Sequence, residues 1–333
     1  MPQPDADPFL GAFTLALIGA SITAWGYLLS RLDRADRILA YEPRRPVPWG
    51  WPAASVAFIL VLLTVPAAIA IGTADRAPID ISPSEATEHI LGFLLFQVVV
   101  GAVAVAIPFL TSRPDRRDLG LPDGFRQLLR DVGIGAIACL ASIAPVFGML
   151  LLMQYLEGGA KPSHHPLIET VEKASSLGVL ILASISAVIF APISEEIVFR
   201  LLLQGWLEKW EAEKVGSLMG PPTEEMQMTN EEQPPTTDSS IVIRHSSLFP
   251  TQPPERGLFG LPYGWTPILI SSVLFALAHF GYGPEPVPLF FLALILGYVY
   301  QRTHRIVPCI VMHALFNLVS VIALWRMIGL SPE

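Results

Sequence analysis

The chain has 333 residues, of which 52% are hydrophobic and 15% charged, and its mean hydropathy is +0.52. Because a soluble domain carries about a quarter charged residues, this composition excludes a disordered protein and an ordinary cytosolic enzyme. It predicts a membrane protein. The 21 Lys and Arg residues against 29 Asp and Glu residues give a net charge of −8, so no basic excess attracts a nucleic acid and no such partner is expected.

Eight apolar runs predict an all-α fold, a polytopic membrane bundle of about eight transmembrane helices. A helix needs about 20 apolar residues to cross a hydrocarbon core of about 30 Å. In chain order the runs cover residues 9–29, 51–71, 90–110, 132–152, 180–207, 265–282, 287–300 and 306–328. They are continuous rather than alternating, which excludes the strands of a membrane barrel. Pro66, Pro108 and Pro145 are expected to kink their helices or to lie near helix ends.

The Lys and Arg residues of the loops predict the orientation. The loops after the first, third, fifth and seventh runs are basic, whereas those after the second, fourth and sixth carry few such residues or none. Because basic loops stay in the cytoplasm, both termini are predicted to lie outside. The first run has no positive segment before it, so we interpret it as a retained span rather than a secretory signal. The expected location is a bacterial plasma membrane.

The pattern divides the chain into two parts. Residues 1–158 are predicted to hold spans one to four, and residues 159–333 to hold the remaining spans and the polar groups described next. A stretch at 208–262, rich in Pro, Glu, Thr and Ser, interrupts the second part. Such a composition cannot bury enough apolar area to offset its ordering entropy. We therefore interpret it as a disordered cytoplasmic insertion.

Polar and ionisable side chains cluster inside three of the later runs. They are Glu195, Glu196 and Arg200 in span five, His279 in span six, and His313 and Asn317 in span eight. Such residues are costly in a bilayer and are therefore functional candidates. Glu196 and Arg200 are four residues apart and can pair, whereas Glu195 points about 100° away from Glu196. Counting from the cytoplasmic ends of their spans, Glu195 and His279 lie about 18 and 21 Å deep, so one site can hold the whole set.

Glutamate, histidine and asparagine in a dry pocket favour hydrolysis. Glu195 is predicted to act as the general base that takes a proton from water, with His279 orienting that water. His313 and Asn317 can donate hydrogen bonds to the oxyanion that forms at an attacked carbonyl. The sequence therefore predicts a hydrolytic site without a serine or cysteine nucleophile.

The three motifs resemble the signature of the CPBP intramembrane proteases, which include the type II CAAX prenyl endopeptidases and bacteriocin-processing proteins. They read Glu195-Glu196-x-x-x-Arg200, Phe275-x-x-x-His279 and His313-x-x-x-Asn317. The resemblance implies an eight-helix bundle and a glutamate-dependent endopeptidase in which Arg200 holds Glu196 in place. It also implies a substrate that is a membrane-associated peptide or a lipidated, CAAX-like protein. Leu201 departs from the family, in which a glycine often follows the motif arginine.

Two alternatives stay open at this point. Glu195, His279 and His313 also form an acceptable ligand set for a catalytic zinc, although the sequence contains no His-Glu-x-x-His motif. No cofactor is expected, with zinc as the alternative, and Cys139 and Cys309 offer no Cys-based site because both lie in apolar runs. The second alternative is a non-catalytic immunity or scaffold protein. The expected partners are the substrate and membrane lipids, and the sequence does not determine an oligomeric state.

Overall fold

The structure is a computed structural model that describes residues 8–33, 38–73, 82–156, 168, 170–171, 176–219, 254–280 and 286–328. Its helices are α1 (Pro8–Asp33), α2 (Trp51–Thr73), α3 (Pro83–Ser112), α4 (Phe125–Leu156), α6 (Leu177–Ile185), α7 (Ala191–Glu196), α8 (Gly205–Met219), α10 (Trp265–Ala278), α11 (Pro286–Thr303) and α12 (Ile306–Ile328). Two π-helical stretches, η1 (Ser186–Phe190) and η2 (Ile197–Gln204), join α6, α7 and α8, and a short 3-10 helix, η3 (Leu258–Gly260), precedes α10. No β-strand occurs among the described residues. The predicted all-α bundle is confirmed.

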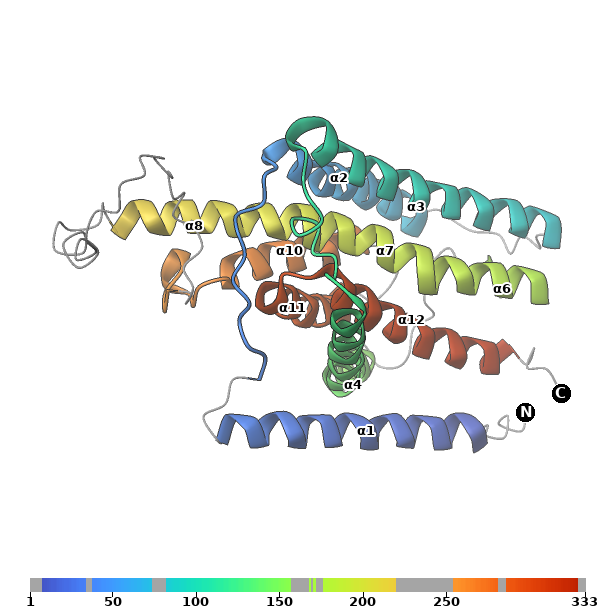
Figure 1. Cartoon of the computed structure of the whole chain (residues 1–333). Coiled ribbons are helices and arrows are strands. Elements are labelled where there is room, and N and C mark those ends of the chain that lie inside the picture. Colours follow the sequence, from blue (N-terminus) through green and yellow to red (C-terminus); the bar gives the residue numbers. More distant parts are fainter. Residues whose placement is uncertain are drawn as a thin grey trace, which may run out of the picture.

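The helices are arranged in layers. Figure 1 shows α1 at one edge of the bundle and α2 and α3 at the opposite edge, with α7, α10, α11 and α12 between them. α4 packs against α1, α11 and α12 and so joins the edge helix to the centre. One continuous apolar core includes Trp49, Phe199, Leu292 and Phe316, which come from all parts of the chain. The division at residues 158 and 159 stays a prediction.

Each predicted span coincides with a helix, but the sixth is shorter than expected. Five helical stretches are long and apolar enough to cross a membrane: Pro8–Arg31, Pro83–Ser112, Phe125–Leu156, Leu177–Gly216 and Ile306–Arg326. α10 ends at Ala278 after 14 residues, about 21 Å, which is less than the hydrocarbon core of about 30 Å. The Gly and Pro residues that follow His279 in the sequence explain this early end. The protein is a multi-pass helical bundle in which α10 is too short to cross alone.

The predicted insertion begins later than expected. α8 runs to Met219, and two of its carboxylates are buried rather than solvated: Glu208 pairs with Arg44 at 3.1 Å, and Glu211 accepts from the backbone N–H of Gly264 at 2.8 Å. These contacts stabilise the helix at residues whose composition alone predicted disorder. Residues 254–262 are also described, whereas residues 220–253 lie outside the described residues. Residues 208–219 of the predicted insertion are therefore helical, and the insertion itself stays a prediction.

The start of α1 and the end of α12 lie at the same end of the bundle (Figure 1). The guanidinium carbon of Arg326 is 4.7 Å from the ring centroid of Phe9. The assignment of this end to the outside stays a prediction.

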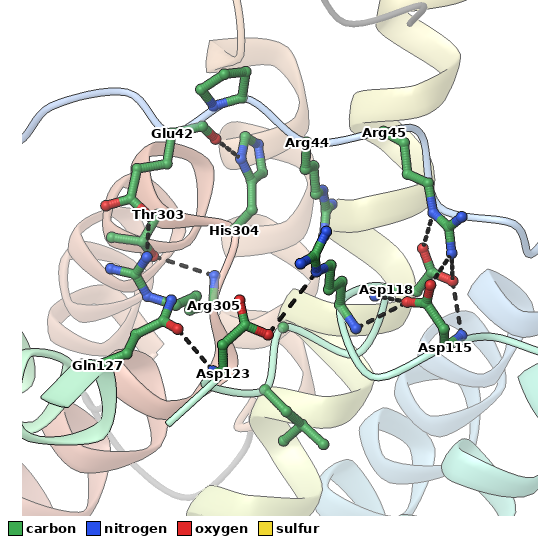
Figure 2. A pocket seen from close by; sticks show the side chains of 14 residues that line it. Glu42, Arg44, Arg45, Asp115, Asp118, Asp123, Gln127, Thr303, His304 and Arg305 are labelled. Carbon is green, nitrogen blue, oxygen red and sulfur yellow. Dashed lines mark hydrogen bonds and ion pairs between the residues drawn. The ribbon is translucent and has the colours of Figure 1, made fainter. Parts of the chain in front are cut away.

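Three of the basic loops meet at the other end of the bundle, around a polar pocket of 390 Å³ (Figure 2). Arg45 donates to both carboxylate oxygens of Asp118, at 2.8 and 2.7 Å. Arg305, between α11 and α12, pairs with Asp131 of α4 at 2.6 Å and also with Glu42. These pairs fasten the loops that follow α1, α3 and α11 to one another.

The loop after α3 also contributes its own backbone to this junction. The backbone N–H of Asp118 and the nearby Arg45 guanidinium hold the pKa of Asp115 below its usual value. Gly120 in the same loop has φ of +64°, and its carbonyl accepts from the N–H of Ile306 at 3.1 Å. A Cβ at Gly120 would lie 2.8 Å from the carbonyl oxygen of His304. The loop can therefore approach the start of α12 only with glycine at this position.

We predict that Gly120→Ala lowers the free energy of unfolding by about 1–3 kcal/mol, because the new Cβ adds both backbone strain and a clash. Thermal unfolding of the purified protein in detergent, followed by tryptophan fluorescence, measures the effect. Gly133→Ala in α4 is the matched control, since a Cβ there meets nothing within 4 Å. Equal unfolding midpoints for the two variants would contradict the close-contact argument.

Candidate active site

Glu196 is the buried centre of the candidate site. Its side chain is 0% exposed, its Oε2 accepts from Arg200 Nε at 3.2 Å, and its Oε1 lies 2.8 Å from His313 Nδ1. The predicted pair of Glu196 and Arg200 is therefore present. The contact with His313 was not predicted, and it joins α7 to α12.

Glu195 points to a different place, as the angle between neighbouring helical residues requires. Its Oε2 lies 3.9 Å from His279 Nε2 and 3.8 Å from His313 Nε2. Both distances exceed a direct hydrogen bond, and this oxygen is buried with no hydrogen-bond partner among the described residues. The Glu195 and His279 side chains are 22% and 20% exposed, so the site is open on one side. The structure thus brings three of the predicted residues around one point.

The hydrogen-bond partner of Nδ1 indicates which ring nitrogen of each histidine carries the hydrogen. His279 Nδ1 lies 2.8 Å from the carbonyl oxygen of Phe275, which can only accept, so Nδ1 carries a hydrogen. His313 Nδ1 faces the carboxylate of Glu196 in the same way. In its neutral form each ring therefore directs the Nε2 lone pair toward Glu195, whereas a protonated His313 directs an N–H there. This arrangement can orient a water molecule.

Phe275 packs between these groups. It is fully buried, and its ring centroid lies 4.8 Å from that of His279, 5.8 Å from that of His313 and 5.3 Å from that of Phe199. The Arg200 guanidinium lies 5.4 Å from the same centroid. The aromatic ring restricts both imidazoles to one orientation.

Asn317 lies one turn beyond His313 and contacts the irregular helix η1. The N–H of Ala191 donates to the Ser186 carbonyl in π-helical register, so the carbonyl of Ala187 loses its usual α-helical donor. The next candidate donor, at position 192, is a proline without N–H. The Asn317 amide donates to this carbonyl at 2.8 Å. One of its two amide hydrogens is thereby used, and the second is available for another acceptor.

Several polar side chains behind the site were not predicted from the sequence. Arg200 donates to Ser271 at 3.0 Å, Ser271 donates to Gln204 at 3.2 Å, and Gln204 donates to Glu208 at 3.1 Å. Positions 196, 200, 204 and 208 repeat every four residues, so this buried stripe could have been found from the helical period. Ser271 carried no such signal, because a lone serine in an apolar helix is common.

No group of three or more His, Cys, Asp and Glu side chains in the described part of the chain is arranged to hold a metal. The two cysteines, Cys139 and Cys309, are buried in the apolar core and form no disulfide. Whether zinc binds to the Glu195, His279 and His313 set is a matter for the chelation experiment below.

The chain was also compared with known proteins. Residues 253–319 match the family described as type II CAAX prenyl endopeptidase Rce1-like. The matched segment contains His279, His313 and Asn317, and it begins after the glutamate motif at 195–200. No match was found among curated proteins or among solved structures. The family resemblance seen in the sequence is confirmed over this segment.

The two adjacent glutamates are expected to differ in their effect on stability. Glu196→Gln leaves the buried Arg200 charge without its counter-ion, which costs about 3–5 kcal/mol of unfolding free energy. Glu195→Gln is expected to change this free energy by less than about 1 kcal/mol, because Glu195 is part exposed and makes no direct hydrogen bond through Oε2. Thermal unfolding of both variants in the same detergent measures the difference. Similar losses in both variants would contradict the structural assignment of Glu196.

Proposed function

We propose that this multi-pass membrane protein is an intramembrane endopeptidase that uses a water activated by Glu195, since residues 253–319 match the Rce1-like family of type II CAAX prenyl endopeptidases. The observation that carries the proposal is the position of Glu195 Oε2, at 3.9 and 3.8 Å from the Nε2 atoms of His279 and His313. A single water molecule at hydrogen-bond distance from these atoms fits such spacings.

The first step is proton transfer. Glu195 takes one proton from the water. His279 Nε2 accepts a hydrogen bond from the second O–H of that water and so orients it. The oxygen of the water then forms a bond to the carbonyl carbon of the substrate, and the carbonyl oxygen becomes an oxyanion. When the C–N bond breaks, Glu195 returns its proton to the leaving amine. The products are a carboxylic acid and an amine, and the glutamate is regenerated.

His313 and Asn317 are proposed to stabilise the oxyanion. Because His313 Nδ1–H is committed to Glu196, its Nε2 can donate only when the ring is an imidazolium. The buried Glu196 carboxylate, which also pairs with Arg200, favours that charge. The second amide hydrogen of Asn317 supplies another donor. In this arrangement Arg200 and Glu196 act through His313 rather than on the substrate.

The proposed substrate is a membrane-associated peptide or a lipidated, CAAX-like protein, in keeping with the family of the C-terminal helices. We further propose a bacterial plasma membrane as the location, with both termini outside. The pairing of the basic loops after α1, α3 and α11 at one end of the bundle supports a common cytoplasmic face (Figure 2).

Zinc is the second candidate occupant of the site. Glu195, His279 and His313 would have to move to hold it, because no such group in the described part of the chain is arranged around a metal position. Each imidazole does donate its other N–H to an oxygen, the pattern typical of metal-bound histidines. A bound zinc would lower the pKa of a coordinated water. The experiment with a chelator decides between the two forms of the hydrolase.

The first test is peptide cleavage by the purified protein in lipid, with and without a strong chelator. The panel contains a farnesylated CaaX peptide, the same peptide without the lipid, and a general fluorogenic peptide. Glu195→Gln is expected to lower kcat by about 10²–10⁴-fold, the contribution of a general base. Ser194→Ala is the matched control, because Ser194 is the buried neighbour that only donates to the carbonyls of Phe190 and Ala191.

The outcomes of this assay separate the candidate functions. Cleavage that resists the chelator and is lost in Glu195→Gln supports the glutamate mechanism. Cleavage that is lost on chelation and returns with added zinc supports the metal form. Full activity of Glu195→Gln would refute both, and failure of the wild type on every peptide would favour the non-catalytic immunity or scaffold role.

Asn317→Ala provides a test of the oxyanion site. Loss of one oxyanion donor is expected to lower kcat by about 10²–10³-fold with little change in KM. The orphaned carbonyl of Ala187 is expected to cost about 1–3 kcal/mol of unfolding free energy as well, so activity is measured below the unfolding transition of the variant. An unchanged kcat in the folded variant would show that Asn317 does not stabilise the oxyanion and only contacts the Ala187 carbonyl.

A further inference from the structure

An apolar pocket of 190 Å³ lies between α6, η1 and α12 and adjoins the candidate active site. Asn317 and Ala187 both line it, and they are the two residues joined by the amide hydrogen bond of 2.8 Å. The pocket therefore begins at the residue that is proposed to stabilise the oxyanion.

Two helical faces form the walls of the pocket. α12 contributes positions 317, 320, 321 and 324, and the helix that runs from α6 into η1 contributes positions 180, 183, 184 and 187. Each set has the spacing of a single helical face. Because Ala183, Ser184, Ala187 and Ser320 have short side chains, the two faces leave a space between them instead of interdigitating. Ser320 is also exposed, so the pocket is open at this wall.

Hydrogen bonds hold the two faces together at separate levels. One is the bond from Asn317 to the carbonyl of Ala187. At the other level the indole Nε1 of Trp325 donates to the Ser184 hydroxyl at 2.9 Å, and this hydroxyl donates to the carbonyl of Leu180 at 2.7 Å. In a bilayer such polar contacts between helices have no competing water. The walls are therefore fixed by the contacts that join α6 and η1 to α12.

The wall selects an apolar occupant. No ionisable side chain is among the described residues that line it, whereas Ile168, Val171 and Leu324 give it an aliphatic surface. Counted along α12 from Ile306, the pocket lies about 17–27 Å from the basic loops, a depth at which a charged group is costly.

The volume of the pocket limits the size of the occupant. Its 190 Å³ is slightly more than the about 150 Å³ of an engineered apolar cavity that binds benzene. It is less than the about 300–1,000 Å³ that is typical of sites for larger ligands. A side chain of the size of leucine or phenylalanine therefore fits, whereas a whole farnesyl group does not.

We propose that this pocket binds one unmodified leucine- or phenylalanine-sized side chain, on the substrate residue whose carbonyl is attacked. The proposal rests on the proposed function, since it takes Asn317 as a donor to that carbonyl. A carbonyl oxygen at hydrogen-bond distance from the Asn317 amide nitrogen places the Cα of its own residue within about 5 Å of that nitrogen. The side chain on this Cα can then enter the pocket, which makes Val321 and Leu324 specificity-determining residues.

Photo-crosslinking of the full-length protein in lipid tests this proposal. The probe is a capped alanine pentapeptide with one photoleucine at its centre, and the Glu195→Gln variant is used so that the probe is not cleaved. We expect crosslinks at residues 180–187 and 320–324. The same peptide with leucine at its centre is expected to compete at about tenfold lower concentration than the all-alanine peptide, because leucine buries more apolar surface.

Two further variants make the result specific. Val321→Trp fills the pocket from its wall and is expected to lower this crosslinking about tenfold. Leu318→Trp is the matched control on the same helix, because Leu318 is 38% exposed and does not line the pocket, and it should retain the crosslinking. An equal loss in both variants, equal competition by the two peptides, or crosslinks mainly at other residues would overturn the proposal. Stronger competition by a peptide with S-farnesylcysteine at its centre would assign the pocket to a lipid and would overturn it as well.

This proposal and the proposed function can fail separately. Leucine-dependent crosslinking in the pocket, together with a wild type that cleaves no peptide, would support the pocket as a peptide-binding site and count against the protease. Cleavage that depends on Glu195, without crosslinking in the pocket, would support the protease and refute this subsite.

Discussion

The carboxylate of Glu196 is the interaction on which the rest of the site depends. It is fully buried, and it binds Arg200 of its own helix at 3.2 Å and His313 of α12 at 2.8 Å. A buried ion pair pays a large desolvation cost, which is offset only when the remaining donors and acceptors are satisfied. Here His313 uses the second carboxylate oxygen and Ser271 accepts from one guanidinium nitrogen, while Arg200 Nη2 is buried with no hydrogen-bond partner among the described residues. The pair therefore fixes the rotation of the central helix and the orientation of the histidine at once.

The same helix leaves regular α-helical geometry on both sides of the glutamates. η1 precedes α7 and η2 follows it, and π-helical turns of this kind occur often at functional sites because they displace side chains from their regular positions. The irregularity releases the carbonyl of Ala187, and the amide of Asn317 satisfies it. Asn317, which the sequence predicts to be an oxyanion donor, thus also stabilises the backbone of η1. These two contributions are separable because the amide has two hydrogens.

A buried polar stripe extends from this centre toward the loops. Gln204 bonds both Glu208 and the carbonyl of Gly297 in α11, and Glu208 pairs with Arg44 in the loop before α2. His304, which follows α11, lies 3.4 Å from the same Glu208 carboxylate. The stripe joins the glutamate helix to α10, α11 and two loops without placing an unpaired carboxylate in the apolar core. It also explains why α8 stays helical where the composition predicted disorder.

The sequence by itself determined the all-α fold, the positions of the helices and the identity of the polar residues, because continuous apolar runs and the cost of charge in a bilayer are local properties. The pairing of Glu196 with Arg200 followed from the helical period. Only the tertiary structure decided that His313 bonds Glu196 while facing Glu195, since this depends on how α12 packs against α7. The early end of α10 and the order of residues 208–219 were likewise decided by packing and by partners that are distant in the chain, such as Arg44. A local pattern shows which residues are costly to bury, but the contacts that offset this cost exist only after the helices have assembled.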